Sequence, residues 1–178
     1  MHEKTVNKRT VYEGRILDVE IQDVEMADGR PALREIVRHG GAVAVLARAP
    51  DGRFILVRQF RKPVEQILLE VVAGNREPGE EAEACARREL EEETGYRAAR
   101  IRRLGVIYPS PGYVDERIEV FYADAEPGKG EHRPDEDEHL EAIFMERAEI
   151  VEKIRRNEVP DSKTLAAWLL YEKMEPAE

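Results

Sequence analysis

The sequence predicts a protein of the α+β or α/β class in which helices cover a mixed sheet, with a small antiparallel β region at the N-terminus. Segments rich in β-branched and aromatic residues recur along the chain, whereas few segments have a helical composition. The length of 178 residues is close to that of a single domain, for which roughly 150 residues is usual. We therefore expect one compact domain with a small appendage.

The N-terminal β region covers residues 1–39. The segment VYEGRILDVEIQDVEM favours strands, residues 27–30 have the composition of a turn, and PALREIVRH continues as a strand. These segments predict a small antiparallel meander, and residues 40–178 form the second expected domain.

The second domain begins with strands and a helix. Residues 40–49 and 53–60 are expected strands that flank Asp51-Gly52, a dipeptide typical of hairpin turns. Residues 66–74 (QILLEVVAG) are expected to form one strand. Residues 80–94 contain no Gly, Pro or β-branched residue before their final Thr, and a glycine follows as a suitable left-handed cap, which predicts a helix.

The remainder of the chain predicts further strands and two closing helices. Strands are expected around residues 99–108 and 116–124, and a short strand in LEAIFME. The segments RAEIVEKIRRNE and SKTLAAWLLYEKM favour helices. Strands interleaved with few helices are typical of a mixed sheet covered by helices.

The helix predicted over residues 80–94 has an unusual distribution of charge. Successive residues rotate by about 100°, so Glu89, Glu92 and Glu93 share one face. The helix dipole opposes carboxylates near the C-terminus by about 0.3–1 kcal/mol each, and such local inconsistencies are expected at functional sites. One interpretation is a solvated surface helix. The other is a site where three hard oxygen ligands bind Mg²⁺ or Mn²⁺.

The acidic balance limits the classes of partner. The chain has 38 acidic residues against 28 Lys and Arg, which gives a formal net charge of −10. Such a chain repels the phosphate backbone of nucleic acids, so nucleic-acid binding is disfavoured. Bound divalent cations would reverse the sign locally and admit a small phosphate.

The single cysteine, Cys85, excludes an intrachain disulfide and a sulfur-based metal site. The first ten residues have no apolar signal core, and no window approaches the roughly 18 apolar residues of a membrane span. We therefore expect a cytoplasmic protein that does not bind membranes.

The segment GNREPGEEAEACARRELEEETGY, residues 74–96, resembles the signature of Nudix hydrolases, G-x5-E-x7-R-E-U-x-E-E-x-G-U, in which U is aliphatic. Tyr96 departs from it at the last aliphatic slot, which is a packing position. The resemblance implies the family's α/β/α sandwich with a mixed sheet, in which this box holds divalent cations against a diphosphate. The matching positions are Gly74, Glu80, Arg88, Glu89, Leu90, Glu92, Glu93 and Gly95.

The resemblance also implies roles for residues of the box. Glu89 and Glu93 would be the principal metal ligands and Glu92 a further one, and Ala73 would offer its carbonyl oxygen. Arg88 would orient the carboxylates. For Glu80 two interpretations stay open, because it is either an anion favoured by the helix dipole or a residue that helps to position the site.

Outside the box, the chain resembles the ADP-ribose pyrophosphatase branch of the family. Pro111 lies sixteen residues after Gly95, the spacing at which that branch carries a proline, although Ser-Pro-Gly is otherwise a plain turn signal. LVRQFRKPV and LLEVVAG are similar to segments of the same branch. Arg34 is a weaker match and is equally explained as an exposed strand charge. The implied substrate-binding residues are Arg34, Arg61, Glu70, Pro111 and Gly112.

The acidic run from Asp135 to Glu138 is either a solvated loop or part of the site. In the resembled branch a distal loop supplies a catalytic carboxylate and a further metal ligand, which implies Glu136 and Glu138 for these roles. Glu116 resembles another active-site glutamate, and Glu116 and Glu92 are further candidates for the general base.

The resemblance implies Mg²⁺-dependent hydrolysis of ADP-ribose to AMP and ribose 5-phosphate, with two or three Mg²⁺ ions, or Mn²⁺, in each active site. One alternative is another Nudix substrate, such as a nucleotide sugar or a dinucleotide. A non-catalytic acidic module that binds metal or a basic partner is the other. The resemblance also implies a homodimer that exchanges its N-terminal β region, which fits a meander with no covering helix.

Overall fold

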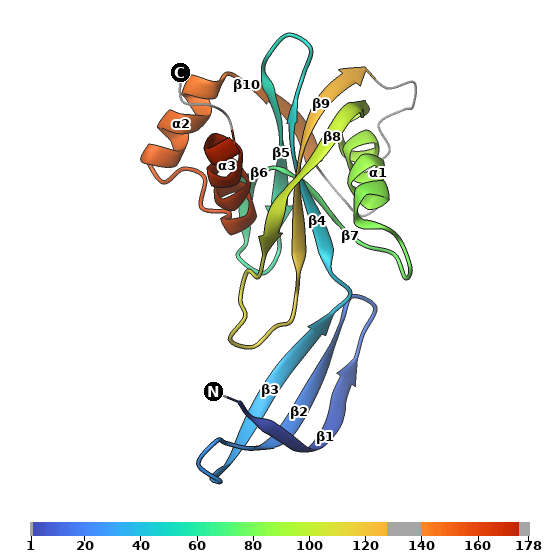
Figure 1. Cartoon of the computed structure of the whole chain (residues 1–178). Coiled ribbons are helices and arrows are strands. Elements are labelled where there is room, and N and C mark those ends of the chain that lie inside the picture. Colours follow the sequence, from blue (N-terminus) through green and yellow to red (C-terminus); the bar gives the residue numbers. More distant parts are fainter. Residues whose placement is uncertain (1, 128–139, 175–178) are drawn as a thin grey trace. The chain divides into compact units, whose positions relative to one another are not determined.

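The computed structural model describes residues 2–127 and 140–174. The chain divides into two compact units, whose elements are labelled in Figure 1. Unit 1 consists of Met1–Gly41 and Tyr108–Arg117, and unit 2 consists of Ala42–Ile107 and Ile118–Glu178. No helix among the described residues is long and apolar enough to cross a membrane.

Unit 1 contains a three-stranded antiparallel sheet. Its strands β1 (Lys4–Glu13), β2 (Leu17–Glu25) and β3 (Pro31–His39) pair in this order, which confirms the predicted meander. The segment Tyr108–Arg117 is attached to β3, because the N–H of Val37 donates to the carbonyl of Tyr113 at 2.7 Å.

Unit 2 is built on a mixed sheet, as predicted. Its main path runs β10-β5-β4-β9-β8, with β6 paired to β5 and β7 paired to β4. Strands β4 and β9 are parallel, whereas the other pairs are antiparallel. The strands are β4 (Ala42–Arg48), β5 (Phe54–Arg61), β6 (Gln66–Glu70), β7 (Val72–Asn75), β8 (Tyr96–Ile107), β9 (Ile118–Pro127) and β10 (Leu140–Met145).

Helices cover both faces of this sheet, which gives the expected α/β/α sandwich (Figure 1). Side chains alternate between the faces of a strand. On one face Val43 and Val45 pack in the apolar cluster that includes helix α1 (Ala82–Thr94). On the other face Ala44 and Leu46 pack in the cluster with α2 (Arg147–Arg155) and α3 (Ser162–Met174).

The strand predicted over residues 66–74 is in fact two strands. Residues 66–70 pair with β5, whereas residues 72–75 pair with β4. Val71 lies at the change of partner, and its N–H donates to the hydroxyl of Thr164 at 2.8 Å. The change of partner brings Gly74 beside Val43, and thereby fixes where the loop to α1 begins.

The box helix has nearly the predicted limits. It begins at Ala82 rather than at residue 80, and it ends at Thr94. Gly95 adopts a left-handed conformation with φ of 73°, and its N–H donates to the carbonyl of Glu91 at 2.8 Å. The predicted glycine cap is therefore confirmed.

Candidate active site

Helix α1 places the Glu89 carboxylate directly over strand β7. A Cβ atom added to Gly74 would collide with all three carboxyl atoms of Glu89. The glycine is therefore needed for the close approach of a side chain to the strand. Ala73, the proposed carbonyl ligand, precedes it on β7 and pairs with Ala44 of β4.

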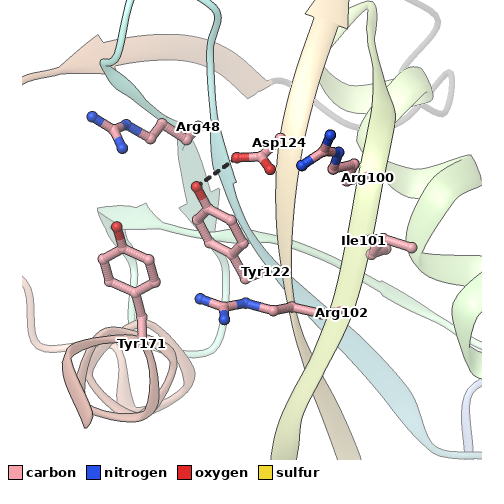
Figure 2. A pocket seen from close by; sticks show the side chains of 7 residues that line it. All are labelled: Arg48, Arg100, Ile101, Arg102, Tyr122, Asp124 and Tyr171. Atoms are coloured by element: carbon pink, nitrogen blue, oxygen red, sulfur yellow. Dashed lines mark hydrogen bonds between the residues drawn. The ribbon is translucent and has the colours of Figure 1, made fainter. Parts of the chain in front are cut away.

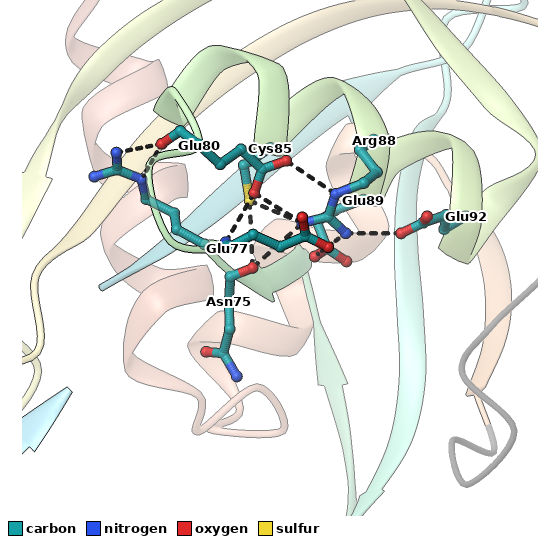
Figure 3. Close-up of polar contacts among 8 residues, drawn as sticks. Asn75, Glu77, Glu80, Cys85, Arg88, Glu89 and Glu92 are labelled. Carbon is teal, nitrogen blue, oxygen red and sulfur yellow. Dashed lines mark hydrogen bonds and ion pairs between the residues drawn. The ribbon is translucent and has the colours of Figure 1, made fainter. Parts of the chain in front are cut away.

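Arg88 donates hydrogen bonds to three carboxylates of the box. Its Nε and Nη2 atoms donate to Glu80 at 3.0 and 3.1 Å (Figure 3). Its Nη1 atom donates to Glu89 at 2.7 Å and to Glu92 at 2.8 Å. One guanidinium group thus holds three carboxylates in place, as expected of a residue that orients the site. We call Arg88, Glu80, Glu89 and Glu92 the box cluster.

Glu80 contacts Arg88 and lies outside the helix. It lies before the first residue of α1, and it also accepts a hydrogen bond from the N–H of Glu77 at 3.0 Å. The hydrogen bonds from Arg88 lower the pKa of Glu80 from 4.5 to about 2, against an opposing effect of burial. Of the two interpretations of Glu80, these contacts favour the positioning residue.

The box cluster contains more negative than positive charge. Its three carboxylates face the single guanidinium of Arg88. Glu93 lies one helical turn after Glu89 and is only 4% exposed. Divalent cations relieve such a surplus of charge, and carboxylate oxygens are the ligands that Mg²⁺ and Mn²⁺ prefer. The donor set therefore fits the expected metal.

The carboxylates of the described residues do not form a ready-made metal site. Within the part of the chain that the structure describes, no three acidic, histidine or cysteine side chains form a group that could hold an ion. Arg88 explains this, because it holds the carboxylates of Glu89 and Glu92. Binding of a cation would require these side chains to exchange contacts with Arg88 for contacts with the ion.

A second ionic network joins β5, β6 and the beginning of α3. Nε and Nη2 of Arg61 donate to the two carboxylate oxygens of Glu70 at 2.8 and 2.7 Å. Lys163 also donates to Glu70, and it donates to Asp161 at 3.0 Å. We call Arg61, Glu70, Asp161 and Lys163 the strand network.

The strand network brings together two residues that were predicted to bind substrate, Arg61 and Glu70. Glu70 is 1% exposed. Burial on its own would raise the pKa of Glu70, but the contacts with Arg61 and Lys163 outweigh it and lower this pKa. Glu70 is therefore a buried anion that fixes the guanidinium of Arg61.

Arg61 also lies within electrostatic reach of the box helix. Its pKa is raised mainly by the hydrogen bonds to Glu70, and the charge of Glu93 adds a smaller contribution. The charge of Glu93, a predicted metal ligand, thus acts on Arg61, a predicted substrate-binding residue.

Lys163 and Asp161 were not predicted as part of the site. Asp161 caps α3, because its carboxylate accepts hydrogen bonds from the N–H and the hydroxyl of Thr164 at 2.9 and 2.6 Å. The signal for a cap is visible in Asp161-Ser162-Lys163-Thr164, just before an apolar run. It predicts the beginning of the helix but not the contact with Glu70.

The other described residues of the predicted site belong to unit 1. Arg34 lies on β3 and donates to Glu3 at 3.0 Å. The segment Tyr108–Arg117 contains Pro111, Gly112 and Glu116. Glu136 and Glu138 lie outside the described residues.

Asp115 is a residue of this segment that the sequence did not single out. Its carboxylate accepts hydrogen bonds from Arg38 at 2.8 Å and from the N–H of His39 at 2.9 Å. These contacts anchor to β3 the turn that carries Pro111 and Gly112.

Comparisons with known proteins agree with these features. Residues 38–169 match the NUDIX domain. The chain is 43% identical to an ADP-ribose pyrophosphatase of Bacillus subtilis (strain 168), over 94% of this chain and 91% of the relative. It is 39% identical to a methanol dehydrogenase activator of Bacillus methanolicus, over 93% and 90% of the two chains.

The fold is also similar to that of a solved protein. A crystal structure of an ADP compounds hydrolase superposes with a TM-score of 0.83 at 25% sequence identity, and covers 97% of this chain and 94% of that chain. The box predicted from residues 74–96, the α/β/α sandwich that carries it and the match over residues 38–169 all agree: the chain belongs to the Nudix hydrolase family.

Proposed function

We propose that this protein hydrolyses the diphosphate of ADP-ribose and releases AMP and ribose 5-phosphate, with the help of divalent cations. The observation that carries the proposal is the box cluster, in which carboxylates in excess of the single Arg88 guanidinium lie over Gly74. The name of the Bacillus subtilis relative, which is 43% identical, supports ADP-ribose as the substrate.

The carboxylates of the box helix would hold the cations. We assign this role to Glu89, Glu92 and Glu93 with the carbonyl of Ala73, and to Glu138 as a further ligand. Bound Mg²⁺ would neutralise the diphosphate and lower the pKa of water. Arg88 holds the carboxylates of Glu89 and Glu92, which would exchange these contacts for contacts with the cation. Two or three ions in each site are part of the proposal.

Arg61 is the residue that we assign to the substrate phosphates. Glu70 holds its Nε and Nη2 atoms, which fixes the plane of the guanidinium, and we assign the Nη1 atom to the phosphate oxygens. In the hydrolysis, a water oxygen forms a bond to phosphorus, the bridging P–O bond breaks and a carboxylate accepts the proton of the water. We assign the base to Glu136, with Glu116 and Glu92 as alternatives.

Residues of unit 1 complete the proposal. Arg34, Pro111 and Gly112 would contact the substrate.

The N-terminal β region would form a homodimer with a second copy of the chain. The exposed apolar side chains of β1 support dimerisation, since Val6 and Tyr12 are 66% and 58% exposed. Light scattering after size-exclusion chromatography would give the mass of the particle. The cytoplasmic location stays a prediction from the sequence.

The test is an assay of AMP release from ADP-ribose with Mg²⁺. Glu93→Gln removes a proposed ligand while keeping the size of the side chain, and Glu91→Gln is a matched control on another face of the same helix. We expect Glu93→Gln to lose activity and Glu91→Gln to retain it. Full activity of a folded Glu93→Gln variant would overturn the assignment.

A panel of substrates tests the specificity separately. The panel contains ADP-ribose, a GDP-hexose, another nucleotide sugar and a dinucleotide, with identification of the products. Preferred hydrolysis of another diphosphate would keep the Nudix mechanism but replace the substrate. Metal binding without turnover of any member would favour the non-catalytic module.

A further inference from the structure

Unit 2 contains a cationic pocket on the face of the sheet that α3 covers (Figure 2). Its volume is about 490 Å³. This is within the range of about 300–1,000 Å³ that is usual for pockets that bind organic ligands. Its polar and aromatic lining consists of Arg48, Arg100, Arg102, Tyr122, Asp124 and Tyr171.

The pocket lies on the opposite face of the sheet from the box cluster. On β4, Ala44 and Leu46 point to the α3 face, and Arg48 continues this alternation. Gly74 of the box pairs with Val43, near the beginning of the same strand. Arg48 lies five positions after Val43, which corresponds to about 16 Å along β4. The pocket is therefore separate from the site of hydrolysis.

The charge of the pocket points to an anionic ligand. Three guanidinium groups and one carboxylate line it, although the whole chain has a net charge of −10. The carboxylate of Asp124 already accepts a hydrogen bond from the hydroxyl of Tyr122 at 2.8 Å, and Arg48 donates to the carbonyl of Gly52 at 3.0 Å. The lining therefore carries a surplus of positive charge, which a bound anion would offset.

Aromatic side chains make the wall of the pocket rigid. The rings of Tyr122 and Tyr171 stack, with centroids 5.0 Å apart and planes inclined by 20°. The guanidinium of Arg102 lies over the ring of Tyr122, 5.1 Å from its centroid. This packing orders the wall before any ligand binds, which reduces the entropic cost of binding.

We propose that this pocket binds a small organic phosphate monoester. Arg48 and Arg100 would hold its phosphate oxygens by charge-assisted hydrogen bonds, and the organic group would occupy the rest of the volume. A bare inorganic ion would leave most of a cavity of about 490 Å³ unfilled. This inference does not depend on the proposed hydrolysis, because it uses none of the residues of the box.

Isothermal titration calorimetry of the full chain, in EDTA and at fixed ionic strength, tests the proposal. The probes are AMP and ribose 5-phosphate, with adenosine as the control without phosphate. Chelation removes cations from the box, whose surplus carboxylates then repel phosphates. We expect saturable binding of at least one of the two phosphates and none of adenosine.

Paired variants localise the binding. We expect Arg48→Gln/Arg100→Gln to weaken it about tenfold or more. Arg58→Gln/Arg156→Gln removes the same charge from exposed ion pairs with Glu141 and Glu152, and should leave the affinity within about twofold of the wild type. Circular dichroism verifies the fold of each variant. Arg100→Lys keeps the positive charge but removes the planar guanidinium, and we expect it to retain only part of the wild-type affinity.

The box variant Glu89→Gln/Glu93→Gln separates this site from the active site. We expect it to bind the phosphate with the affinity of the wild type. The proposal is wrong if no phosphate binds to the wild type, if adenosine binds equally well, if the two arginine pairs lose affinity equally, or if the box variant abolishes binding.

Discussion

Two ionic networks in unit 2 are built from the same residue types but differ in charge balance. In the box cluster, three carboxylates share the single guanidinium of Arg88. In the strand network, the carboxylates of Glu70 and Asp161 are matched by the cations of Arg61 and Lys163. In the strand network the positive and negative charges balance. In the box cluster a surplus of negative charge is left, which a further cation would neutralise.

The two networks also differ in the burial of one carboxylate each. The Glu70 side chain is 1% exposed, whereas that of Glu92 is 44% exposed. A buried charge is tolerated when it is paired and hydrogen-bonded, and its loss is costly. A surplus of charge can persist where solvent or an ion reaches it. We infer that the buried anion of the strand network, Glu70, mainly stabilises the fold and the position of Arg61, and that the box cluster mainly serves chemistry.

The largest expected effect is on stability, from Glu70→Gln. This change leaves Arg61 and Lys163 without their shared anion, so we expect the free energy of unfolding to fall by about 3–5 kcal/mol. Chemical denaturation measures it. Glu141→Gln is the control, because Glu141 forms an exposed pair with Arg58, and it should cost less than about 1 kcal/mol. Equal losses would contradict the comparison.

The next effect is on activity, from Gly74→Ala. The added Cβ would displace the carboxylate of Glu89, and we expect kcat/KM for ADP-ribose to fall about 100-fold. Gly105→Ala is a suitable control, since its Cβ would meet only the end of the Leu170 side chain, at 3.3 Å. Wild-type activity of Gly74→Ala would show that the position of Glu89 is unimportant.

Glu80→Gln tests the positioning contact within the box cluster. Loss of the charged hydrogen bonds to Arg88 should cost about 2 kcal/mol of stability at neutral pH. The pKa of Glu80 is lowered from 4.5 to about 2, so its stabilisation is complete above pH 4.5 and is lost as the pH falls toward 2. The variant should lack this part of the acid transition.

The control for Glu80→Gln is Glu83→Gln. Glu83 pairs with Arg87 on the same helix at 2.8 Å, but its side chain is 58% exposed. Thermal unfolding between pH 2 and 6 measures both variants. An acid transition of Glu80→Gln that is identical to that of the wild type would remove Glu80 from the positioning role.

The smallest expected effect is the stabilisation by metal. Mg²⁺ at ten times its dissociation constant should raise the free energy of unfolding by about 1.4 kcal/mol, because it binds the folded chain. Glu89→Gln/Glu93→Gln should show no such rise at equal ionic strength. Stabilisation of this variant by Mg²⁺ would place the ion elsewhere.

The local parts of this structure could be predicted from the sequence. The box helix and its cap follow from composition and from Gly95, and the spacing of Glu89 and Glu93 puts both carboxylates on one face. The Asp51-Gly52 turn was also predicted, and Gly52 has φ of 93°. Each of these features depends on residues that are close together in the sequence, which is why the local sequence predicts it.

The non-local parts could not be predicted. A run of apolar residues does not reveal its partners, so the exchange from β5 to β4 at Val71 was missed. Lys163 and Glu70 are 93 positions apart, and nothing in either segment indicates their contact. The family resemblance implied that Arg88 orients the carboxylates. The close approach of Glu89 to Gly74 depends on how α1 packs on β7, which the sequence does not reveal.

Cys85 gives the box a built-in reporter. Its thiol is fully buried, donates to the carbonyl of Asn75 at 3.5 Å and accepts from Arg88 at 3.4 Å. Burial raises its pKa to about 12, so an alkylating reagent can react only when helix and loop separate. With one cysteine in the chain, the rate of alkylation measures how often the box opens, and a ligand that closes it slows the chemistry of the thiol.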